Sequence, residues 1–264
     1  MISPRQIGGG PARLRAHRVP GKGPDQSIEQ RGPRETTDHI IGISEALASR
    51  ITCRAFLDTS VSEATVRAIL AGASQAPSGG NLQPWHVWAL AGDELGRLEA
   101  IVKRKIRAGQ FADGAPDYEV YPTPMKEPYA TRRFKNGEAV YAAFGSERDN
   151  ADVRMRQFER NFEFFGAPVG LFLAIDRSMQ QGQWADLGMF MQSIMLLARE
   201  FDLHTAALES WSFWQSTVSK FLAMPKELIL FRGMAIGHMD RAHPINRVRA
   251  GRAPLDEFAR LSGF

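Results

Sequence analysis

Two arginines and a hydroxyl side chain alternate in the run from Ser49 to Phe56: they are Arg50, Thr52 and Arg54. Side chains two residues apart in an extended backbone point the same way, so the spacing predicts two cations and one hydroxyl on one side. Guanidinium groups make strong, charge-assisted hydrogen bonds to phosphate and carboxylate oxygens. The run is therefore a candidate cradle for an anionic ligand, and a solvated basic face is the alternative.

A second candidate is the run from residue 76 to residue 85, which reads Ala-Pro-Ser-Gly-Gly-Asn-Leu-Gln-Pro-Trp. Its two glycines permit a close approach between the backbone and a ligand. Asn81 and Gln83 offer amides that both donate and accept hydrogen bonds, which suits the edge of a heteroaromatic ring. The alternative is a structural turn that joins a helix to a strand.

A third candidate follows a predicted strand that ends at Gly237. Three arginines, Arg247, Arg249 and Arg252, lie within six residues of one another in this part of the chain. A charge run on the surface is the ordinary interpretation, so these arginines matter only if the fold brings them to the other candidates.

The local patterns of several common enzyme classes are missing. No G-x-G-x-x-G follows a predicted strand, and there is no G-x-x-x-x-G-K-[ST], H-E-x-x-H or G-x-S-x-G. The closest histidines, His238 and His243, have no cysteine nearby, which favours a satisfied or solvent-facing pair over a metal site. A classical nucleotide-binding fold, a zinc enzyme and a serine hydrolase are therefore disfavoured.

The composition is that of an ordinary globular protein, with 44% hydrophobic and 23% charged residues. The longest uncharged apolar runs, 164–175 and 187–198, have 12 residues each. A membrane-spanning helix needs about 20, which excludes an integral membrane protein. The single cysteine, Cys53, cannot form an internal disulfide, so we expect a reducing, cytoplasmic environment. We interpret Cys53 as a packed apolar residue rather than a redox group.

The first 37 residues are predicted to form a disordered basic arm, with a folded domain at 38–264. Residues 1–33 contain six glycines and five prolines, and residues 1–24 carry a charge of +5. Since the net charge is +4, the remaining 240 residues carry −1. The basicity therefore belongs to the arm, and an arm that binds nucleic acid or a membrane is the alternative.

Apolar periodicity and capping residues predict the elements that must position the three candidates. Asp38 is a predicted cap for a helix with apolar residues Ile40, Ile43 and Leu47, and Ser60 begins a predicted capping box with Glu63. The alternation of helices and strands predicts a mixed α/β or α+β sandwich. The other predicted helices are 93–108, 150–165 and 184–201, and the predicted strands are 86–90, 169–175 and 228–236.

Residues 109–146 contain four prolines, four glycines and all four tyrosines of the chain. Long irregular segments inside compact domains are often lids or binding loops, so we expect a lid-like loop over a site.

Taken together, the three candidates resemble the FMN-dependent nitroreductase family from about Ser44 to the C-terminus. Shorter matches at Asn161–Pro168, Trp184–Gly188 and Glu209–Trp211 are similar to the branch that contains the 4-nitrobenzoate reductases. The residues that carry the main match are Arg50, Thr52, Arg54 and Phe56, then Pro77, Ser78, Asn81, Gln83, Pro84 and Trp85, and finally Gly237, Arg252, Pro254, Leu255 and Glu257.

The resemblance implies a three-layer α/β/α sandwich of the α+β class with a mixed sheet, and an intertwined homodimer with FMN between its subunits. It further implies an oxidoreductase that takes hydride from NADH or NADPH onto FMN and passes electrons to a nitroaromatic or quinone-like acceptor in a ping-pong cycle. No protein nucleophile is then needed. No nucleic acid or membrane partner is expected. The helix at 184–201 is apolar almost all round, so we expect it to be buried on every side.

The implied FMN-binding residues fall into distinct roles. Arg50 and Arg252 would hold the phosphate, Arg54 would stabilise the reduced ring, and the backbone N–H of Glu209 or Ser210 would meet the flavin N5 atom. Arg54 and Glu209 are thus tuning residues, without a catalytic acid or base. The other implied contacts are Thr52, Pro77, Ser78, Gly79, Asn81, Gln83, Leu208 and Arg249.

One departure from the family pattern lies next to the expected flavin. Residues 206–208 read Ala-Ala-Leu where the branch commonly has Cys-Pro-Gln, so cofactor affinity, redox tuning or acceptor preference is expected to differ. The same fold hosts reductive dehalogenases and an oxygen-dependent enzyme that fragments flavin. A reductive dehalogenase of halogenated aromatics and a non-enzymatic flavin-binding sensor therefore remain alternatives.

Overall fold

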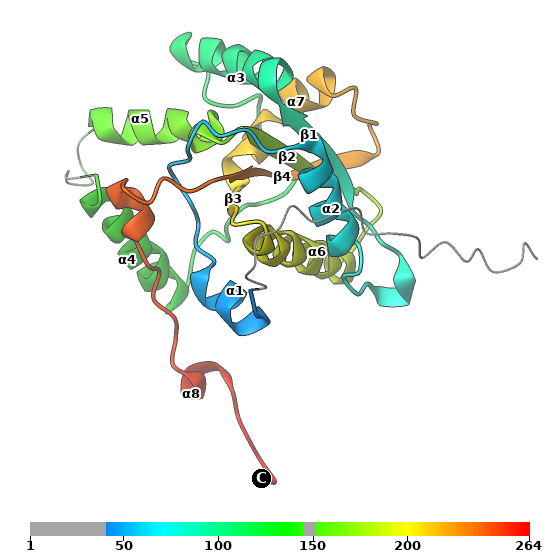
Figure 1. Ribbon diagram of the computed structural model, residues 1–264, viewed down its shortest axis with the longest axis vertical. Coiled ribbons are helices and arrows are strands. Elements are labelled where there is room, and N and C mark those ends of the chain that lie inside the picture. The colour runs from blue at the N-terminus through cyan, green and yellow to red at the C-terminus, as the bar shows by residue number, and fades with distance from the viewer. Residues whose placement is uncertain (1–40, 145–150) are drawn as a thin grey trace, which may run out of the picture. The chain divides into compact units, whose positions relative to one another are not determined.

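The computed structural model describes residues 41–144 and 151–264 (Figure 1). The predicted basic arm and the predicted cap Asp38 lie outside the described residues. The α-helices are α1 (Ile43–Ser49), α2 (Glu63–Ala73), α3 (Gly92–Arg107), α4 (Tyr129–Ala142), α5 (Ala151–Asn161), α6 (Gln181–Glu200), α7 (Gln215–Phe221) and α8 (Leu255–Phe258). Short 3-10 turns are η1 (Gly79–Asn81), η2 (Phe164–Gly166), η3 (Glu209–Trp214) and η4 (Pro244–Arg247).

One sheet of four strands forms the centre of the fold. The strands are β1 (His86–Ala91), β2 (Val169–Asp176), β3 (His204–Leu208) and β4 (Leu228–Gly237), in the order β1-β2-β4-β3. Every neighbouring pair is antiparallel. Parallel pairing is limited, among the described residues, to a bridge between Thr52 and Thr205. The four strands therefore form an antiparallel sheet, and the predicted mixed character is limited to the Thr52 bridge at the β3 edge.

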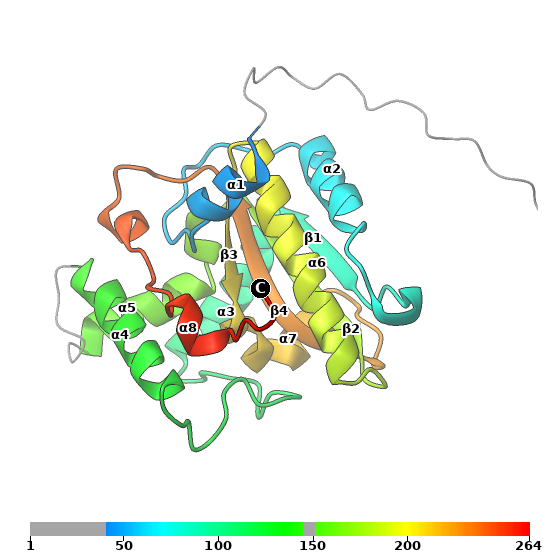
Figure 2. The same ribbon diagram turned by 90° about the horizontal axis from the view of Figure 1, so that it is seen from below.

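The sheet is covered by helices on both faces, as the predicted three-layer sandwich requires (Figure 2). Along β2, the fully buried Leu171 and Leu173 pack with α2 and α6, whereas Phe172 packs with α3 and α7 on the other face. Successive side chains of a strand point to opposite faces, so a run without polar residues is what a strand buried on both faces requires.

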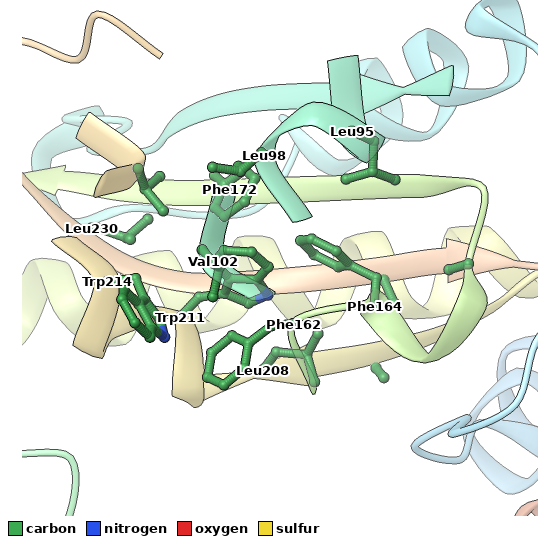
Figure 3. Packing of buried hydrophobic residues seen from close by; sticks show 14 of the residues in the cluster. Leu95, Leu98, Val102, Phe162, Phe164, Phe172, Leu208, Trp211, Trp214 and Leu230 are labelled. Atoms are coloured by element: carbon green, nitrogen blue, oxygen red, sulfur yellow. The ribbon is translucent and has the colours of Figure 1, made fainter. Parts of the chain in front are cut away.

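The α3 side of the core is built from aromatic rings around Trp211 in η3 (Figure 3). The Trp211 indole stacks on Phe164 at a centroid distance of 5.0 Å and meets Phe172 edge to face at 5.0 Å. It also lies flat against Gly233 of β4, where an added Cβ would come within 2.4 Å of Trp211. This close packing fixes η3, and with it the residues that follow β3.

Several helix boundaries differ from the predictions. Helix α2 begins at Glu63, and Ser62 rather than Ser60 is its N-cap: the Ser62 hydroxyl accepts a hydrogen bond of 3.1 Å from the Thr65 N–H. Helix α1 begins only at Ile43, after Gly42. Helix α4 occupies residues that were predicted to be irregular, and residues 109–128 form the irregular segment before it.

The prediction that α6 is buried on every side does not hold within one chain. Leu187, Phe190 and Ile194 are buried, but Ala185 and Gly188 are exposed and 40% of Met189 is exposed. One face of α6 is thus buried against the sheet, and another face is left exposed. Among the described residues, no helix combines the length and hydropathy that a membrane span requires.

Candidate functional site

The segment from Arg50 to Ala55 runs beside β3 with its side chains alternating as predicted. Ile51, Cys53 and Ala55 are buried, at 7%, 0% and 4% exposure, whereas the even-numbered residues are half-buried. The Cys53 N–H donates to the Thr205 carbonyl at 3.0 Å and supports the parallel bridge of Thr52 with Thr205. Arg50, Thr52 and Arg54 therefore share one side of an extended segment that is fixed to the sheet edge.

Arg252 approaches this segment from the chain that follows β4. Burial and then the neighbouring Arg252 guanidinium lower the pKa of Arg50, and burial lowers the pKa of Arg54. Arg249 lies on the same chain segment, where its guanidinium donates to the Asn246 carbonyl at 2.8 Å. The fold thus brings Arg50 and Arg252, two cations from opposite ends of the domain, near one another.

None of these four arginines forms an ion pair with a carboxylate in the described part of the chain, whose ion pairs all involve other residues. Like charges that face one another without a carboxylate destabilise the free protein, and a bound phosphate would relieve that repulsion through charge-assisted hydrogen bonds. The cluster has the chemistry of a phosphate site.

The end of β3 supplies a second part of the site. The bridge at Thr205 places Glu209 about 13 Å further along, at about 3.3 Å per residue. The Leu208 side chain is only 4% exposed and belongs to the core, so its backbone alone can meet a ligand. The Ser210 hydroxyl oxygen is buried without a hydrogen-bond partner. Such an unpaired polar group at the end of the cationic segment fits a polar ligand that extends from the arginines toward η3.

Glu209 is held from β4 and from the irregular segment 109–128. Its carboxylate forms an ion pair with Arg232 at 2.6 Å. Burial and then the Glu209 carboxylate raise the pKa of Tyr121, over whose ring the Arg133 guanidinium lies at 4.4 Å. The Tyr118 hydroxyl donates to the Phe231 carbonyl at 2.5 Å. The predicted lid thus lies against the η3 end of the site.

The loop from Pro77 to Gln83 joins α2 to β1 and has a strained backbone. Gly80, Asn81 and Gln83 have positive φ angles of 60°, 57° and 49°, a conformation that costs residues with a side chain about 1–2 kcal/mol. The Gln83 N–H donates to the Ser78 hydroxyl at 3.0 Å, and the Gly79 N–H donates to the Asp186 carboxylate of α6 at 3.1 Å. Strain of this kind in an exposed loop marks functional sites.

Asp186 fixes this loop, and its removal is expected to loosen it. Asp186→Ala leaves the Gly79 N–H without its partner, so the free energy of unfolding should fall by about 1.5–3 kcal/mol, as for a hydrogen bond to a charged group. Hydrogen exchange at residues 78–83 should accelerate. Urea denaturation and exchange mass spectrometry measure both. Asp186→Asn keeps an acceptor and should recover most of the loss; equal behaviour of the two variants would contradict this role.

Within one chain, the loop and the arginine cluster lie at different ends of α6 (Figures 1 and 2). The loop binds Asp186, near the start of the helix, whereas Arg199, near its end, donates to the Ser49 hydroxyl beside Arg50. These two anchors are 13 residues apart, or about 20 Å of helix. The structure therefore brings Arg252 near Arg50 and places residues 208–210 beyond the Thr52 bridge along β3, and it leaves the predicted residues on 77–83 apart.

Sequence reasoning gave no role to Arg232, Asp186 or Asn246. A signal was present for Arg232, which is the one charged residue in the predicted strand 228–236. Asp186 lies inside a matched segment and Asn246 directly precedes Arg247, but only the fold shows their partners. Burial raises the pKa of the Cys53 thiol to about 12, and its S–H donates to the Ala55 carbonyl at 3.2 Å. The interpretation of Cys53 as a packed residue agrees with this environment.

Comparison with known proteins gives consistent matches over most of the chain. The model of the nitroreductase family matches residues 47–238. A nitrobenzene nitroreductase from Ectopseudomonas oleovorans is 34% identical over 217 residues, which are 82% of this chain and 95% of that protein. A 4-nitrobenzoate reductase from Nocardioides sp. is 34% identical over 215 residues, which are 78% of this chain and 84% of that protein.

Solved structures show the same similarity. The FMN and NADPH-dependent nitroreductase NfnB from Sphigopyxis sp. strain HMH superposes with a TM-score of 0.81 at 42% identity, covering 85% of this chain and 100% of that chain. The FMN-dependent nitroreductase NfnB from Mycobacterium smegmatis, solved in complex with NADPH, superposes with a TM-score of 0.79 at 28% identity, covering 83% and 97%.

Proposed function

The chain belongs to the nitroreductase family, and from that premise we propose that it is an NAD(P)H-dependent oxidoreductase that holds FMN and reduces nitroaromatic compounds. The observation that carries the proposal is the cluster around Arg50 and Arg252, whose facing cations have no carboxylate partner in the described part of the chain. The relatives' names support the choice of cofactor and acceptor class.

The site residues fit FMN in one orientation. Arg50 and Arg252, with the Thr52 hydroxyl and Arg249, would hold the phosphate, which carries about two negative charges. Arg54 would then lie further along the ligand, beside the pyrimidine edge of the ring, and the backbone of Glu209 and Ser210 would meet its central edge. When bound, FMN supplies the redox chemistry, accepting hydride from NADH or NADPH and passing electrons to the acceptor. The protein binds, orients and tunes it.

The loop from Pro77 to Gln83 would complete the site from a second copy of the chain. In a two-fold symmetric dimer whose α6 helices run antiparallel, the start of one α6 lies beside the end of the other, which places each loop next to its partner's arginine cluster. The uncovered face of α6 around Met189 supports such a contact. So does the C-terminal segment that begins with α8, where Phe258 and Leu261 are 71% and 72% exposed. We infer a homodimer with two composite FMN sites.

We propose that the basic arm contributes no contact to the flavin. We place the flavin-binding domain at residues 38–264, in the cytoplasm, without a nucleic acid or membrane partner. A chain that begins at Asp38 is expected to bind FMN with unchanged affinity, because every proposed contact lies after residue 49. Flavin titration and gel filtration of both forms measure this. Loss of the soluble dimer on truncation would show instead that the arm supports the subunit contact.

The proposed reaction is tested in two anaerobic half-reactions. Flavin released from the purified protein by heat should be FMN by chromatography. NADH or NADPH should bleach the bound flavin, and nitrobenzene or 4-nitrobenzoate should restore its colour without oxygen. An adenine-containing flavin, or no binding after incubation with FMN, would contradict the proposal. Reoxidation by a halogenated aromatic but by neither nitroaromatic would favour a reductive dehalogenase, and a flavin that NAD(P)H does not bleach would favour a sensor.

A further inference from the structure

Asn246 is a buried amide at the junction between two distant parts of the chain. It lies in η4 with 3% exposure. Its Oδ1 atom accepts a hydrogen bond of 2.8 Å from the Arg54 N–H, and its Nδ2 atom donates to the carbonyls of Ala55 and Asp240, each at 2.8 Å. One side chain therefore joins residues 54–55 to the end of β4.

The backbone of Asn246 extends this connection to the arginines after β4. Its carbonyl accepts the hydrogen bond from the Arg249 guanidinium at 2.8 Å, and its own N–H donates to the His243 carbonyl at 3.1 Å. Asn246 thus contacts the backbone of Arg54 and the guanidinium of Arg249. Asn246 carries no charge, so we expect it to act on the cluster by holding the arginine segments in position.

The Arg54 peptide depends on these side-chain contacts, because it has few others. Backbone pairing holds its neighbours: the Cys53 N–H donates to Thr205, and the Ala55 carbonyl accepts from the Asp240 N–H at 3.0 Å. The Arg54 N–H is bonded to Asn246, and the Arg54 carbonyl accepts from the Arg160 guanidinium of α5 at 3.0 Å. Without Asn246, the part-buried Arg54 N–H would lose its partner, and the Arg54 peptide would keep only one of these two hydrogen bonds.

We propose that Asn246 is a positioning residue of the flavin site, which fixes the Arg54 peptide against the segment of Arg249 and Arg252 and thereby sets the spacing between the ring-end and phosphate-end cations. This inference rests on the proposed function for its redox consequence. Its mechanical part, the immobilisation of residues 53–55, does not require FMN.

The chain contains its own reporter for the mechanical part. Cys53 is the single cysteine, fully buried and adjacent to Arg54. A thiol reagent should therefore label the wild-type protein slowly, and a loosened segment should be labelled faster without any engineered probe. Labelling of the FMN-free protein measures the immobilisation of residues 53–55 alone. Flavin affinity and midpoint potential measure its consequence for the site.

The experiment compares Asn246→Ala with a matched control. Gln215→Ala also removes a part-buried amide that joins distant segments, since its Oε1 accepts from the Leu230 N–H at 2.6 Å and its Nε2 donates to Ser219 at 2.9 Å. Both variants should melt at lower temperature. In Asn246→Ala alone, Cys53 labelling should accelerate about tenfold or more, and reduced FMN should weaken about tenfold more than oxidised FMN. That ratio lowers the potential of a two-electron couple by about 30 mV.

Each outcome decides the proposal. Unchanged Cys53 labelling in Asn246→Ala overturns it, as does faster labelling with wild-type FMN affinity and potential, which would leave Asn246 a purely structural residue. The same response in Gln215→Ala also overturns it. Failure of the wild-type protein to bind FMN would refute the proposed function. Faster labelling in Asn246→Ala would still show that Asn246 immobilises residues 53–55. If Asn246→Ala does not fold, Asn246→Ser, whose hydroxyl cannot span all three contacts, takes its place.

Discussion

Arg252→Ala is expected to weaken FMN binding about equally in the oxidised and reduced states, by about 1.5–3 kcal/mol for a lost charge-assisted hydrogen bond. The reason is that the phosphate carries the same charge in both states. Arg252 lies near Arg50 and forms no ion pair among the described residues. Its Nη1 donates to the carbonyls of Ala250 and Gly251, and we expect the rest of its guanidinium to meet the phosphate. Fluorescence titration with FMN, before and after anaerobic reduction, measures the two affinities.

Arg247→Ala is the matched control for this prediction. Arg247 is an exposed arginine five residues earlier on the same segment, so its loss makes the same change in net charge without a proposed contact. We expect its FMN affinity to equal that of the wild type. Equal weakening by both substitutions would reduce the effect to general electrostatics and contradict a specific phosphate contact at Arg252.

Arg54→Ala is expected to lower the midpoint potential of the bound flavin by tens of millivolts, where about 30 mV corresponds to 1.4 kcal/mol for a two-electron couple. Arg54 lies two residues beyond Thr52 toward the Glu209 end, where we place the pyrimidine edge of the ring. Negative charge develops there only on reduction, so a nearby cation stabilises the reduced form selectively. A redox titration with flavin saturating measures the shift.

Arg54→Lys separates charge from shape at this position. Lysine keeps the cation but not the planar guanidinium. The midpoint potential of the bound flavin should therefore stay closer to the wild-type value than it does in Arg54→Ala. An unchanged potential in Arg54→Ala together with a shifted one in Arg252→Ala would mean that the two arginines have the opposite roles. No effect of either substitution on affinity or potential would remove both from the site.

The parts of the fold that the sequence predicted are those with a strong local pattern. The predicted strand 169–175 of β2 is an uninterrupted apolar run, and β4 has Arg232 as its one charged residue. Helix α3 has Leu95, Leu98 and Val102 at helical spacing, all of them buried. The alternation of Arg50, Thr52 and Arg54 was visible because a period of two needs no tertiary information. Local residue types were sufficient in each case.

The missed elements lack such a pattern. Helix α4 follows a segment rich in prolines and buries only Val140, so no apolar stripe identifies it. Strand β3 has five residues, of which two are alanines with little strand preference; β4 and the Thr52 bridge hold it in place. Partners far apart in the chain, such as Glu209 with Arg232, are set by the register of β3 on β4, and no spacing in the sequence encodes that register.

The split of the site along α6 explains why three matched motifs were necessary to recognise it and why we propose that two chains assemble it. Arg50 and Arg252 meet within the chain, whereas Asn81 and Gln83 lie at the far end of α6. We therefore expect each FMN to be bound by the arginine cluster of one chain and the 77–83 loop of another.

A mixed dimer tests whether each FMN site is shared between two chains. One chain carries Arg50→Ala with Arg252→Ala, and the other carries Asn81→Gly with Gln83→Gly, which remove the loop amides without adding strain at positive φ. Each homodimer should bind little FMN. The heterodimer, purified through two different tags, has one intact composite site, so it should hold one FMN per dimer and about half of the wild-type nitrobenzene reductase activity. A heterodimer as empty as the two homodimers would show that both segments serve the same chain and would contradict the composite site.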